Sequence, residues 1–320
     1  MAKHPLRIFS IIGLLLIAAA SSAAAETRVA LVIGNGSYGG GIGALANAPN
    51  DAKLVTSALQ SAGFAVTTVI DADQKAMKRA FADFGQSLAQ AGPDTVGLFY
   101  YAGHGVQVDG KNFLIPSGAM IQNQADVEME AVDANWVLKQ MEFAGNRVNI
   151  IILDACRNNP LPAGSTRSLE NGLARMDAPT GSFIAYSTAP GAVALDGAGS
   201  NSPYSQALAA AIESQQLPLE LLFRQVRVEV MRETDSKQVP WDSSSLTGEF
   251  YFKAPGDAPD AAIPAPAPAQ PAAVQPVPQP VTRSQSLALP APPGGSFTDC
   301  ADCPEMVVVP AGRFQLGSSA

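Results

Sequence analysis

The sequence contains very little histidine and cysteine. Its 320 residues include two histidines, His4 and His104, and three cysteines, Cys156, Cys300 and Cys303. Cys300-x-x-Cys303 has no second ligand pair that would complete a zinc site, although these two thiols could pair with each other in an oxidising compartment. Cys156 would then be left over, either as a buried inert thiol or as a reactive one.

Positive charge is also scarce. The chain has 20 Lys and Arg residues against 28 Asp and Glu residues, which gives a formal net charge of −8. A protein that binds nucleic acid regardless of sequence needs a basic surface to neutralise phosphates. We therefore expect no nucleic-acid partner, whereas a basic protein or peptide is compatible with this charge.

The N-terminal hydrophobic run is short for a membrane span. It covers residues 8–20, follows basic residues, and falls below the roughly 20 residues that a spanning helix needs. Ala23 and Ala25 fit the A-x-A pattern of a cleavage site. We predict a signal peptide over 1–25 and an exported protein, periplasmic or secreted, with no stable membrane association after cleavage. An uncleaved membrane anchor is the alternative.

Composition divides the rest of the chain into three segments. Hydrophobic residues make up 47% of the sequence, which is enough for a substantial core in a main domain over 27–253. Residues 254–296 contain PAPAPAQPAAVQPVPQP, and such Pro- and Ala-rich sequence with few charges is typical of an extended linker. A short segment over 297–320 follows.

Strand and helix patterns alternate along the main domain. Repeated β-α-β units predict an α/β fold with a mostly parallel sheet and helices on both faces. Asp109-Gly110 lies between two short apolar runs and predicts a hairpin. The expected strands are 28–34, 64–71, 94–103, 147–156, 181–188 and 248–252, and the expected helices are 50–63, 74–92, 131–145, 203–214 and 217–234.

Gly34, Gly36 and Gly39 form a literal G-x-G-x-x-G after the first expected strand. In a dinucleotide-binding loop a helix begins within the motif, and an acidic residue follows about 20 residues later. Here helical periodicity begins only near residue 50, and Asp71 comes about 30 residues after Gly39. The spacing favours a glycine-rich loop at a strand end, with a nucleotide-dependent enzyme as an alternative.

His104 and Cys156 both follow apolar stretches that predict core strands. Because the carboxyl ends of parallel strands meet at one edge of a sheet, we expect the two residues to lie near each other. A thiolate is a strong nucleophile, and a neighbouring imidazole both lowers the thiol pKa and donates a proton to a leaving amine. The pair favours nucleophilic catalysis, whereas Cys156 taken alone favours a structural role.

The sequences around these residues resemble a known family. LFYYAGHGVQVDGKNFLIP and NIIILDACRNNP are similar to the two active-site blocks of the caspase-like cysteine peptidases, in particular the bacterial caspase and metacaspase branch. The resemblance extends over about 28–253. It implies a cysteine endopeptidase in which Cys156 attacks a peptide carbonyl and His104 is the acid and base. It also implies an oxyanion site made of the backbone N–H groups of Gly105 and Cys156.

Two acidic residues match the family's specificity pocket. The metacaspase branch has acids at the positions of Asp51 and Asp154, and they line the pocket for the residue before the cut. The resemblance therefore implies a protein or peptide substrate with Arg or Lys at that position. From the residues alone, Asp51 is about as well explained as a helix N-cap and Asp154 as an acid in a turn after a strand.

The resemblance leaves two further questions open. Some metacaspases use calcium, but the acidic stretch over 126–133 lacks the spacing of an EF-hand loop. We predict no metal or other cofactor, and calcium activation stays open. The alternative to a peptidase is a catalytically silent caspase-like domain that acts as an interaction module.

The C-terminal segment resembles a second family. CPEMVVVPAGRFQLGSS, over 303–319, is similar to the beginning of the formylglycine-generating or sulfatase-modifying domain. That domain is far larger than the residues present, so we assign none of its chemistry to Cys300 or Cys303.

Overall fold

The structure is a computed structural model, and it describes residues 26–39, 41–156, 172–190, 192, 194–214 and 216–254, together with 296–297 and 306–307. The chain divides into two compact units, Met1–Asp260 and Ala261–Ala320. The predicted signal peptide, most of the predicted linker and nearly all of the C-terminal segment lie outside the described residues. Those three predictions therefore stay predictions.

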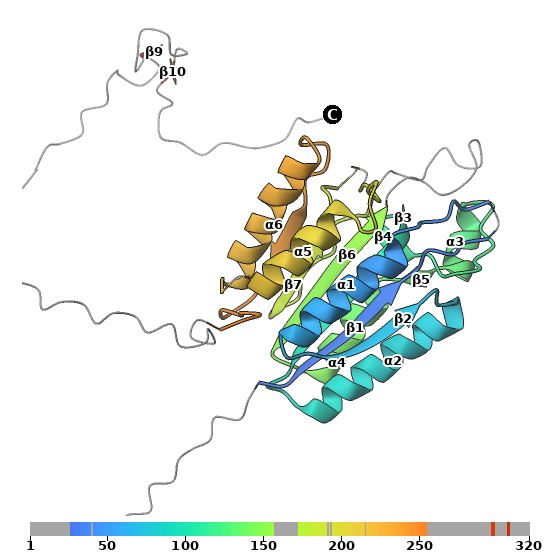
Figure 1. The fold of residues 1–320 in the computed structure, drawn as a ribbon, viewed down its shortest axis with the longest axis horizontal. Coiled ribbons are helices and arrows are strands. Elements are labelled where there is room, and N and C mark those ends of the chain that lie inside the picture. Colours follow the sequence, from blue (N-terminus) through green and yellow to red (C-terminus); the bar gives the residue numbers. More distant parts are fainter. Residues whose placement is uncertain are drawn as a thin grey trace, which may run out of the picture. The chain divides into compact units, whose positions relative to one another are not determined.

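A mostly parallel sheet forms the centre of the first unit (Figure 1). Its main strands run in the order β2-β1-β3-β6-β7-β8, and only β8 is antiparallel to its neighbour. β4 and β5 extend the sheet from the far end of β3. The strands are β1 (Arg28–Gly34), β2 (Ala65–Ile70), β3 (Val96–Val108), β4 (Lys111–Leu114), β5 (Val132–Asp133), β6 (Val148–Cys156), β7 (Ser182–Tyr186) and β8 (Trp241–Ser244).

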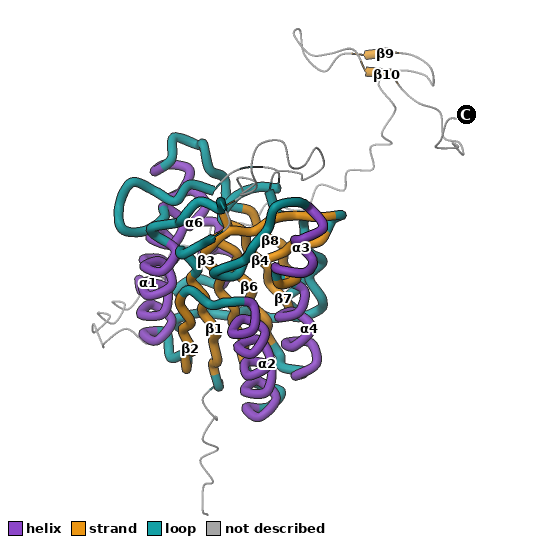
Figure 2. Tube along the Cα trace, turned by 90° about the vertical axis from the view of Figure 1, so that its right-hand side faces the viewer, coloured by secondary structure: helices purple, strands orange, loops and turns teal. Residues whose placement is uncertain are grey.

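Helices cover both faces of the sheet, as Figure 2 shows for α1 on one side and α2 and α4 on the other. α1 packs against α5, α5 against α6, and α2 against α4. This arrangement confirms the predicted fold class. The helices are α1 (Ala48–Ser61), α2 (Gln74–Ala91), α3 (Gln124–Glu130), α4 (Asn135–Ala144), α5 (Pro203–Ser214) and α6 (Leu219–Glu233).

Alternation along the central strands builds two cores. Leu98 and Tyr100 of β3 face the layer of α1, α5 and α6, whereas Phe99 and Tyr101 face the layer of α2 and α4. Successive side chains of a strand point to opposite faces, so a strand covered on both faces is apolar throughout. The same alternation places Asp154 of β6 on the α1 and α5 side, on the face that Ile150 and Ile152 of the same strand occupy.

The last expected strand is wrong. Residues 248–252 form no strand, and only Tyr251 makes an isolated bridge, to Pro218. Phe250 and Phe252 still point inward and are 2% exposed. The alternating pattern therefore predicted correctly which side chains are buried, but these residues do not pair with a neighbouring strand. The strand at this edge of the sheet is the short, polar β8.

Other boundaries differ where the chain makes local turns. β3 continues through His104 to Val108 and leads into the predicted hairpin, in which Asp109 and Gly110 both have positive φ angles of 47° and 75°. The expected helix over 131–145 begins only at Asn135, because β5 comes first.

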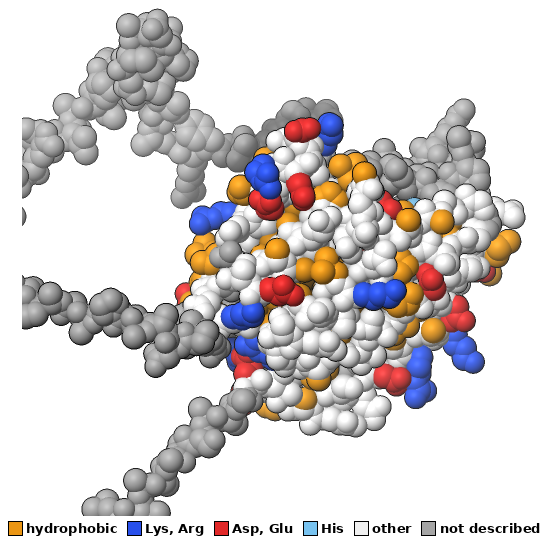
Figure 3. Space-filling model, in the orientation of Figure 1, with side chains coloured by type: hydrophobic (Ala, Val, Ile, Leu, Met, Phe, Trp, Pro, Cys, Tyr) orange, Lys and Arg blue, Asp and Glu red, His pale blue; other side chains and the backbone are white. Residues whose placement is uncertain are grey.

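Charged side chains of both signs are interspersed on the face shown in Figure 3. In the described part of the chain, no helix is long and apolar enough to cross a membrane. The described residues of the second unit are the antiparallel pair β9 (Ser296–Phe297) and β10 (Met306–Val307).

Candidate active site

The sheet register brings the predicted catalytic residues together. In the parallel pair of β3 and β6, the Cα atoms of His104 and Cys156 are partners, and Ala102 is the partner of Asp154. Neighbouring strands lie about 4.8 Å apart, so His104 and Cys156 lie on adjacent strands at the same level of the sheet. The Cys156 side chain lies outside what the structure describes.

The imidazole of His104 is oriented by a backbone carbonyl. Its Nε2 lies 2.7 Å from the carbonyl oxygen of Gly43, and the residue is 6% exposed. Because a carbonyl only accepts hydrogen bonds, Nε2 carries the proton and Nδ1 of the neutral ring holds the lone pair. Nδ1 is buried and has no hydrogen-bond partner among the described residues. The nitrogen that can accept a proton is therefore available.

Two tyrosines fix the backbone and the ring of His104. The Tyr38 ring lies against the imidazole with centroids 4.6 Å apart, and its hydroxyl accepts the His104 N–H at 2.8 Å. The same hydroxyl donates to the carbonyl of Asn35. The Tyr101 hydroxyl donates to the His104 carbonyl at 2.8 Å. His104 is thus held on both sides of its peptide unit.

Burial lowers the pKa of His104 from its usual value. The bond to Gly43 and the negative charge of Asp196 act in the opposite direction. A buried imidazole loses hydration of its charged form, so the neutral ring is favoured near pH 7. Neutral His104 is the form that can take up a proton.

The two predicted specificity acids form a buried pair held by Ser202. We use the name acid pair for Asp51, 2% exposed, and Asp154, 5% exposed. Asp51 Oδ1 accepts the Ser202 N–H at 2.9 Å and the side-chain amide of Asn201 at 3.0 Å. Asp154 Oδ2 accepts the Ser202 hydroxyl at 2.6 Å and the Ser205 hydroxyl at 2.8 Å.

The start of α5 explains why these donors point at the acid pair. Pro203 is the first residue of α5, and Ser202 comes directly before it. The Ser202 hydroxyl accepts the Ser205 N–H at 3.0 Å. Ser202 is therefore an N-cap, with Pro at the position that tolerates its missing N–H. Tyr100 of β3 completes the contact, because its hydroxyl lies 2.6 Å from that of Ser205.

Burial raises the pKa of both carboxyls. Desolvation is the largest cause for Asp51, the charge of Asp154 adds to it, and together they raise the pKa of Asp51 from 3.8 to about 7. Desolvation also raises the pKa of Asp154, against the stabilising hydrogen bonds from Ser202 and Ser205. Neighbouring carboxylates in a dry site cannot both ionise at their usual pKa.

Asp196 is a third acid near the site, and the sequence did not single it out. Its burial raises its pKa, and its charge acts on Asp51, Asp154 and His104. The side-chain amide of Asn47 donates to the Asp196 carbonyl at 2.6 Å. Asp196 lies in a loop between β7 and α5 that has no periodic pattern. Its position near the acid pair therefore follows only from the contacts of the folded loop.

The structural alternatives for the two acids are wrong. The N-cap of α1 is Asn47, and Asp51 lies inside the first turn, where its carboxyl contacts α5 rather than its own helix. Asp154 lies within β6 and is not in a turn. Gly105 is buried in β3 beside His104 and is the register partner of Leu114. Ser202, Asn201 and the Gly43 carbonyl were not predicted.

The N–H groups of the glycine-rich loop bind a carboxylate of the same chain. The Asp71 carboxylate accepts the N–H groups of Gly36 at 2.8 Å and Ser37 at 2.9 Å, and these bonds lower its pKa against the desolvation that would raise it. A Cβ atom on Gly34 would lie 2.6 Å from both the Ala48 carbonyl and the Ala52 side chain. The amides that a pyrophosphate would need are occupied, and α1 begins well after the motif.

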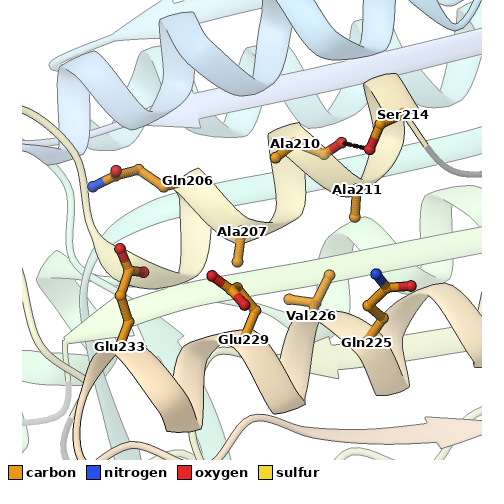
Figure 4. Close-up of a pocket in the computed structure, with 9 residues that line it drawn as sticks. All are labelled: Gln206, Ala207, Ala210, Ala211, Ser214, Gln225, Val226, Glu229 and Glu233. Atoms are coloured by element: carbon orange, nitrogen blue, oxygen red, sulfur yellow. Dashed lines mark hydrogen bonds between the residues drawn. The ribbon is translucent and has the colours of Figure 1, made fainter.

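A separate groove lies between α5 and α6 (Figure 4). Ala207, Ala210 and Ala211 line it from α5, and Gln225 and Glu229 line it from α6. Gln206, which also lines the groove, donates to the Asn201 carbonyl at 3.0 Å, and the side-chain amide of Asn201 donates to Asp51. No group of three or more His, Cys, Asp or Glu side chains in the described part of the chain could hold a metal ion.

Comparison with known proteins identifies the family of the chain. A family profile described as "Caspase domain" matches residues 27–251, and the chain belongs to that family. The chain is also 30% identical over 134 residues to the human protein "Mucosa-associated lymphoid tissue lymphoma translocation protein 1" and 31% identical to its mouse homolog. Each match covers 42% of this chain and 15% of the relative, so the chain spans a small part of these relatives.

Proposed function

We propose that the protein is a cysteine endopeptidase that uses Cys156 as nucleophile and His104 as general base and acid. The observation that carries the proposal is the register of β3 and β6, in which His104 and Cys156 are partners while the free nitrogen of His104 is Nδ1. Membership of the caspase family supports the same chemistry.

In the proposed reaction, His104 Nδ1 takes the proton of the Cys156 thiol, and the thiolate attacks the carbonyl of the scissile peptide bond. The backbone N–H groups of Gly105 and Cys156 would stabilise the oxyanion. Protonated His104 then donates its proton to the leaving amine, and a thioester forms. Water, deprotonated by the same nitrogen, hydrolyses the thioester and restores the thiol.

We further propose that cleavage follows Arg or Lys. The acid pair supports this specificity, because it provides two buried carboxyls whose strongest charged neighbours are also acidic. A cationic side chain would supply the missing counter-charge, whereas an acidic side chain would add a third negative charge beside Asp196.

The test compares fluorogenic peptides that differ only in Arg or Asp before the cut, with wild-type protein and the Cys156→Ala variant. We expect wild type to cleave the Arg peptide and Cys156→Ala to cleave neither peptide while keeping its melting temperature. Each assay is run with and without calcium. Faster cleavage of the Asp peptide would contradict the specificity, and equal inactivity of both proteins under all conditions would favour the interaction module.

Export also stays a proposal, supported by the basic residues, the apolar run over 8–20 and the pair Ala23 and Ala25. N-terminal sequencing of the protein recovered from its native host would test it. A mature N-terminus at Glu26 is expected, and an intact Met1 would favour the uncleaved anchor.

A further inference from the structure

Ser202 contacts both members of the acid pair. Its N–H donates to Asp51 and its hydroxyl donates to Asp154, while Ser205 adds a second donor to the same oxygen of Asp154. These donors are neutral. They hold one carboxyl on α1 and one on β6 in place without supplying a positive charge.

Among the residues that the structure describes, no positively charged side chain acts on the pKa of either member of the acid pair. Asp196 acts on both carboxyls as a further negative charge. Tyr100 of β3 and Tyr204 of α5 are fully buried, and burial raises the pKa of each well above its usual value, so both are neutral. His104 is favoured in its neutral form by its own burial.

Two adjacent carboxyls in such a site retain a proton more easily than they carry two charges. Ser202 can donate to an ionised oxygen of either acid, so it stabilises the singly charged pair whichever carboxyl holds the proton. A guanidinium or ammonium group that enters the site lowers the pKa of both carboxyls, so the doubly ionised pair becomes the favoured form.

We infer that the acid pair shares one proton in the absence of substrate, and that Ser202 is the positioning residue that holds the pair so that a basic side chain enters in exchange for that proton. The inference rests on the proposed specificity for Arg or Lys. The proton passes from the carboxyl to water as the cation enters, and no bond of the substrate is made or broken in this step.

The exchange makes binding depend on pH. The affinity for an Arg peptide should rise about tenfold between pH 6 and pH 8, because the pair loses its proton over this range in the free protein. A peptide with citrulline has nearly the same shape as its Arg counterpart but no charge. It should bind with an affinity that does not follow this change.

The direct test is calorimetry with the full chain carrying Cys156→Ala, which keeps the peptide uncleaved. Titrations of the Arg peptide at pH 6.5, in buffers of different ionisation enthalpy, report the number of protons released. We expect release of about three quarters of a proton at pH 6.5 and of almost none at pH 9, where the pair is already ionised. Absence of proton release at pH 6.5 overturns the shared proton.

The role of Ser202 is tested in the same background. Ser202→Ala removes the hydroxyl donor to Asp154, and should weaken Arg-peptide binding and move the midpoint of proton release to higher pH. Ser202→Thr keeps the hydroxyl and should restore the midpoint. Since Ser202→Ala also removes a helix cap, Asp73→Ala is the matched control, because the Asp73 side chain caps α2 by accepting the Ala76 N–H.

Ser202 is only a helix cap if Ser202→Ala and Asp73→Ala lose similar stability and neither moves the midpoint. The inference can also fail separately from the proposed function. If wild type cleaves the Arg peptide and binding releases no proton, the peptidase assignment stands and the shared proton is wrong. If the Arg peptide is neither bound nor cleaved, the proposed specificity is itself wrong.

Discussion

Asp51 and Asp154 bind opposite ends of the same residue, the backbone N–H and the side-chain hydroxyl of Ser202. The three residues belong to the first helix, a central strand and the N-terminus of α5. No local segment can form this arrangement, so the acid pair exists only when the whole layer of α1 and α5 is packed on the sheet. Because both carboxyls are buried, their ionisation lowers the stability of the folded protein.

Replacement of Asp51 by Asn should stabilise the protein at alkaline pH. The folded-state pKa of Asp51, about 7, lies above 3.8, so the stability linked to this carboxyl is fully present below about pH 4 and is lost as pH rises through 7. Each pKa unit corresponds to about 1.4 kcal/mol, which gives a penalty on the order of 1 to 4 kcal/mol at pH 8. Asn keeps the oxygen that accepts from Asn201 and Ser202.

Thermal melting at pH 5 and pH 8 measures this effect. Asp51→Asn should raise the melting temperature at pH 8 by roughly 2 to 10 °C relative to wild type, with a much smaller difference at pH 5. It should also raise KM for the Arg peptide. If Asp51→Asn is less stable than wild type at pH 8, the ionised Asp51 carboxylate does not lower the stability of the folded protein.

Tyr38→Phe should reduce turnover of the Arg peptide more than it reduces binding. The variant keeps the ring against His104 but removes the hydroxyl that joins the His104 N–H to the Asn35 carbonyl. We expect a loss of about tenfold in kcat, because small misplacements of a catalytic group are costly. The free energy of unfolding should fall by roughly 1 to 2 kcal/mol.

Tyr251→Phe is the control for Tyr38→Phe. The Tyr251 hydroxyl bonds to Glu249 at the surface, away from the candidate active site. The Tyr251→Phe variant should have the same kcat as wild type. If both variants lose turnover equally, the hydroxyl of Tyr38 has no specific effect on His104.

The glycines of the G-x-G-x-x-G stretch should differ in their tolerance of alanine. A Cβ atom at Gly34 meets α1 at 2.6 Å, whereas one at Gly39 has nothing within 4 Å. Gly34→Ala should therefore destabilise the fold by about 1 to 3 kcal/mol, since backbone and core would have to move. Gly39→Ala should be nearly neutral in chemical denaturation. If Gly34→Ala and Gly39→Ala destabilise the fold equally, close packing of Gly34 against α1 does not explain the glycines of this stretch.

Phe250→Ala should be among the most destabilising single changes. Phe250 lies in the core formed with α1, α5 and α6, at 5.2 Å between ring centroids from Phe252 and 6.5 Å from Phe64. Truncation of a buried Phe costs about 3 to 5 kcal/mol. Phe143 is 95% exposed, and Phe143→Ala should change the denaturation midpoint little. A mild effect of Phe250→Ala would show that residues 248–252 are not part of the core.

Much of this architecture follows from the sequence. The central strands are continuous apolar runs because both faces of the sheet are covered. The helix α5 begins at the predicted residue because Pro203 is favoured at the first helical position. Parallel strands align their carboxyl ends, which is why His104 and Cys156 could be placed together from their positions alone.

The parts that could not be predicted depend on contacts between distant segments. Ser202 follows a loop without periodicity, and its N-cap signal indicates a helix start but not which acids it will bind. The Gly43 carbonyl carries no side chain that could mark it. Trp241–Ser244 is short and polar, and it forms a strand only because β7 offers an edge. Residues 248–252 show the reverse, since Phe250 and Phe252 are buried while Tyr251 makes only an isolated bridge, to Pro218.

The bonds from Gly36 and Ser37 to Asp71 also connect the support of His104 to the end of β2. The loop that begins at Gly36 leads to Gly43, whose carbonyl orients His104, so Asp71 anchors one end of the support for that ring. Because its carboxylate keeps a low pKa, the anchor persists in mildly acidic surroundings that would protonate the acid pair. Mild acidification would therefore remove the negative charge of the acid pair while the loop that supports His104 keeps its anchor.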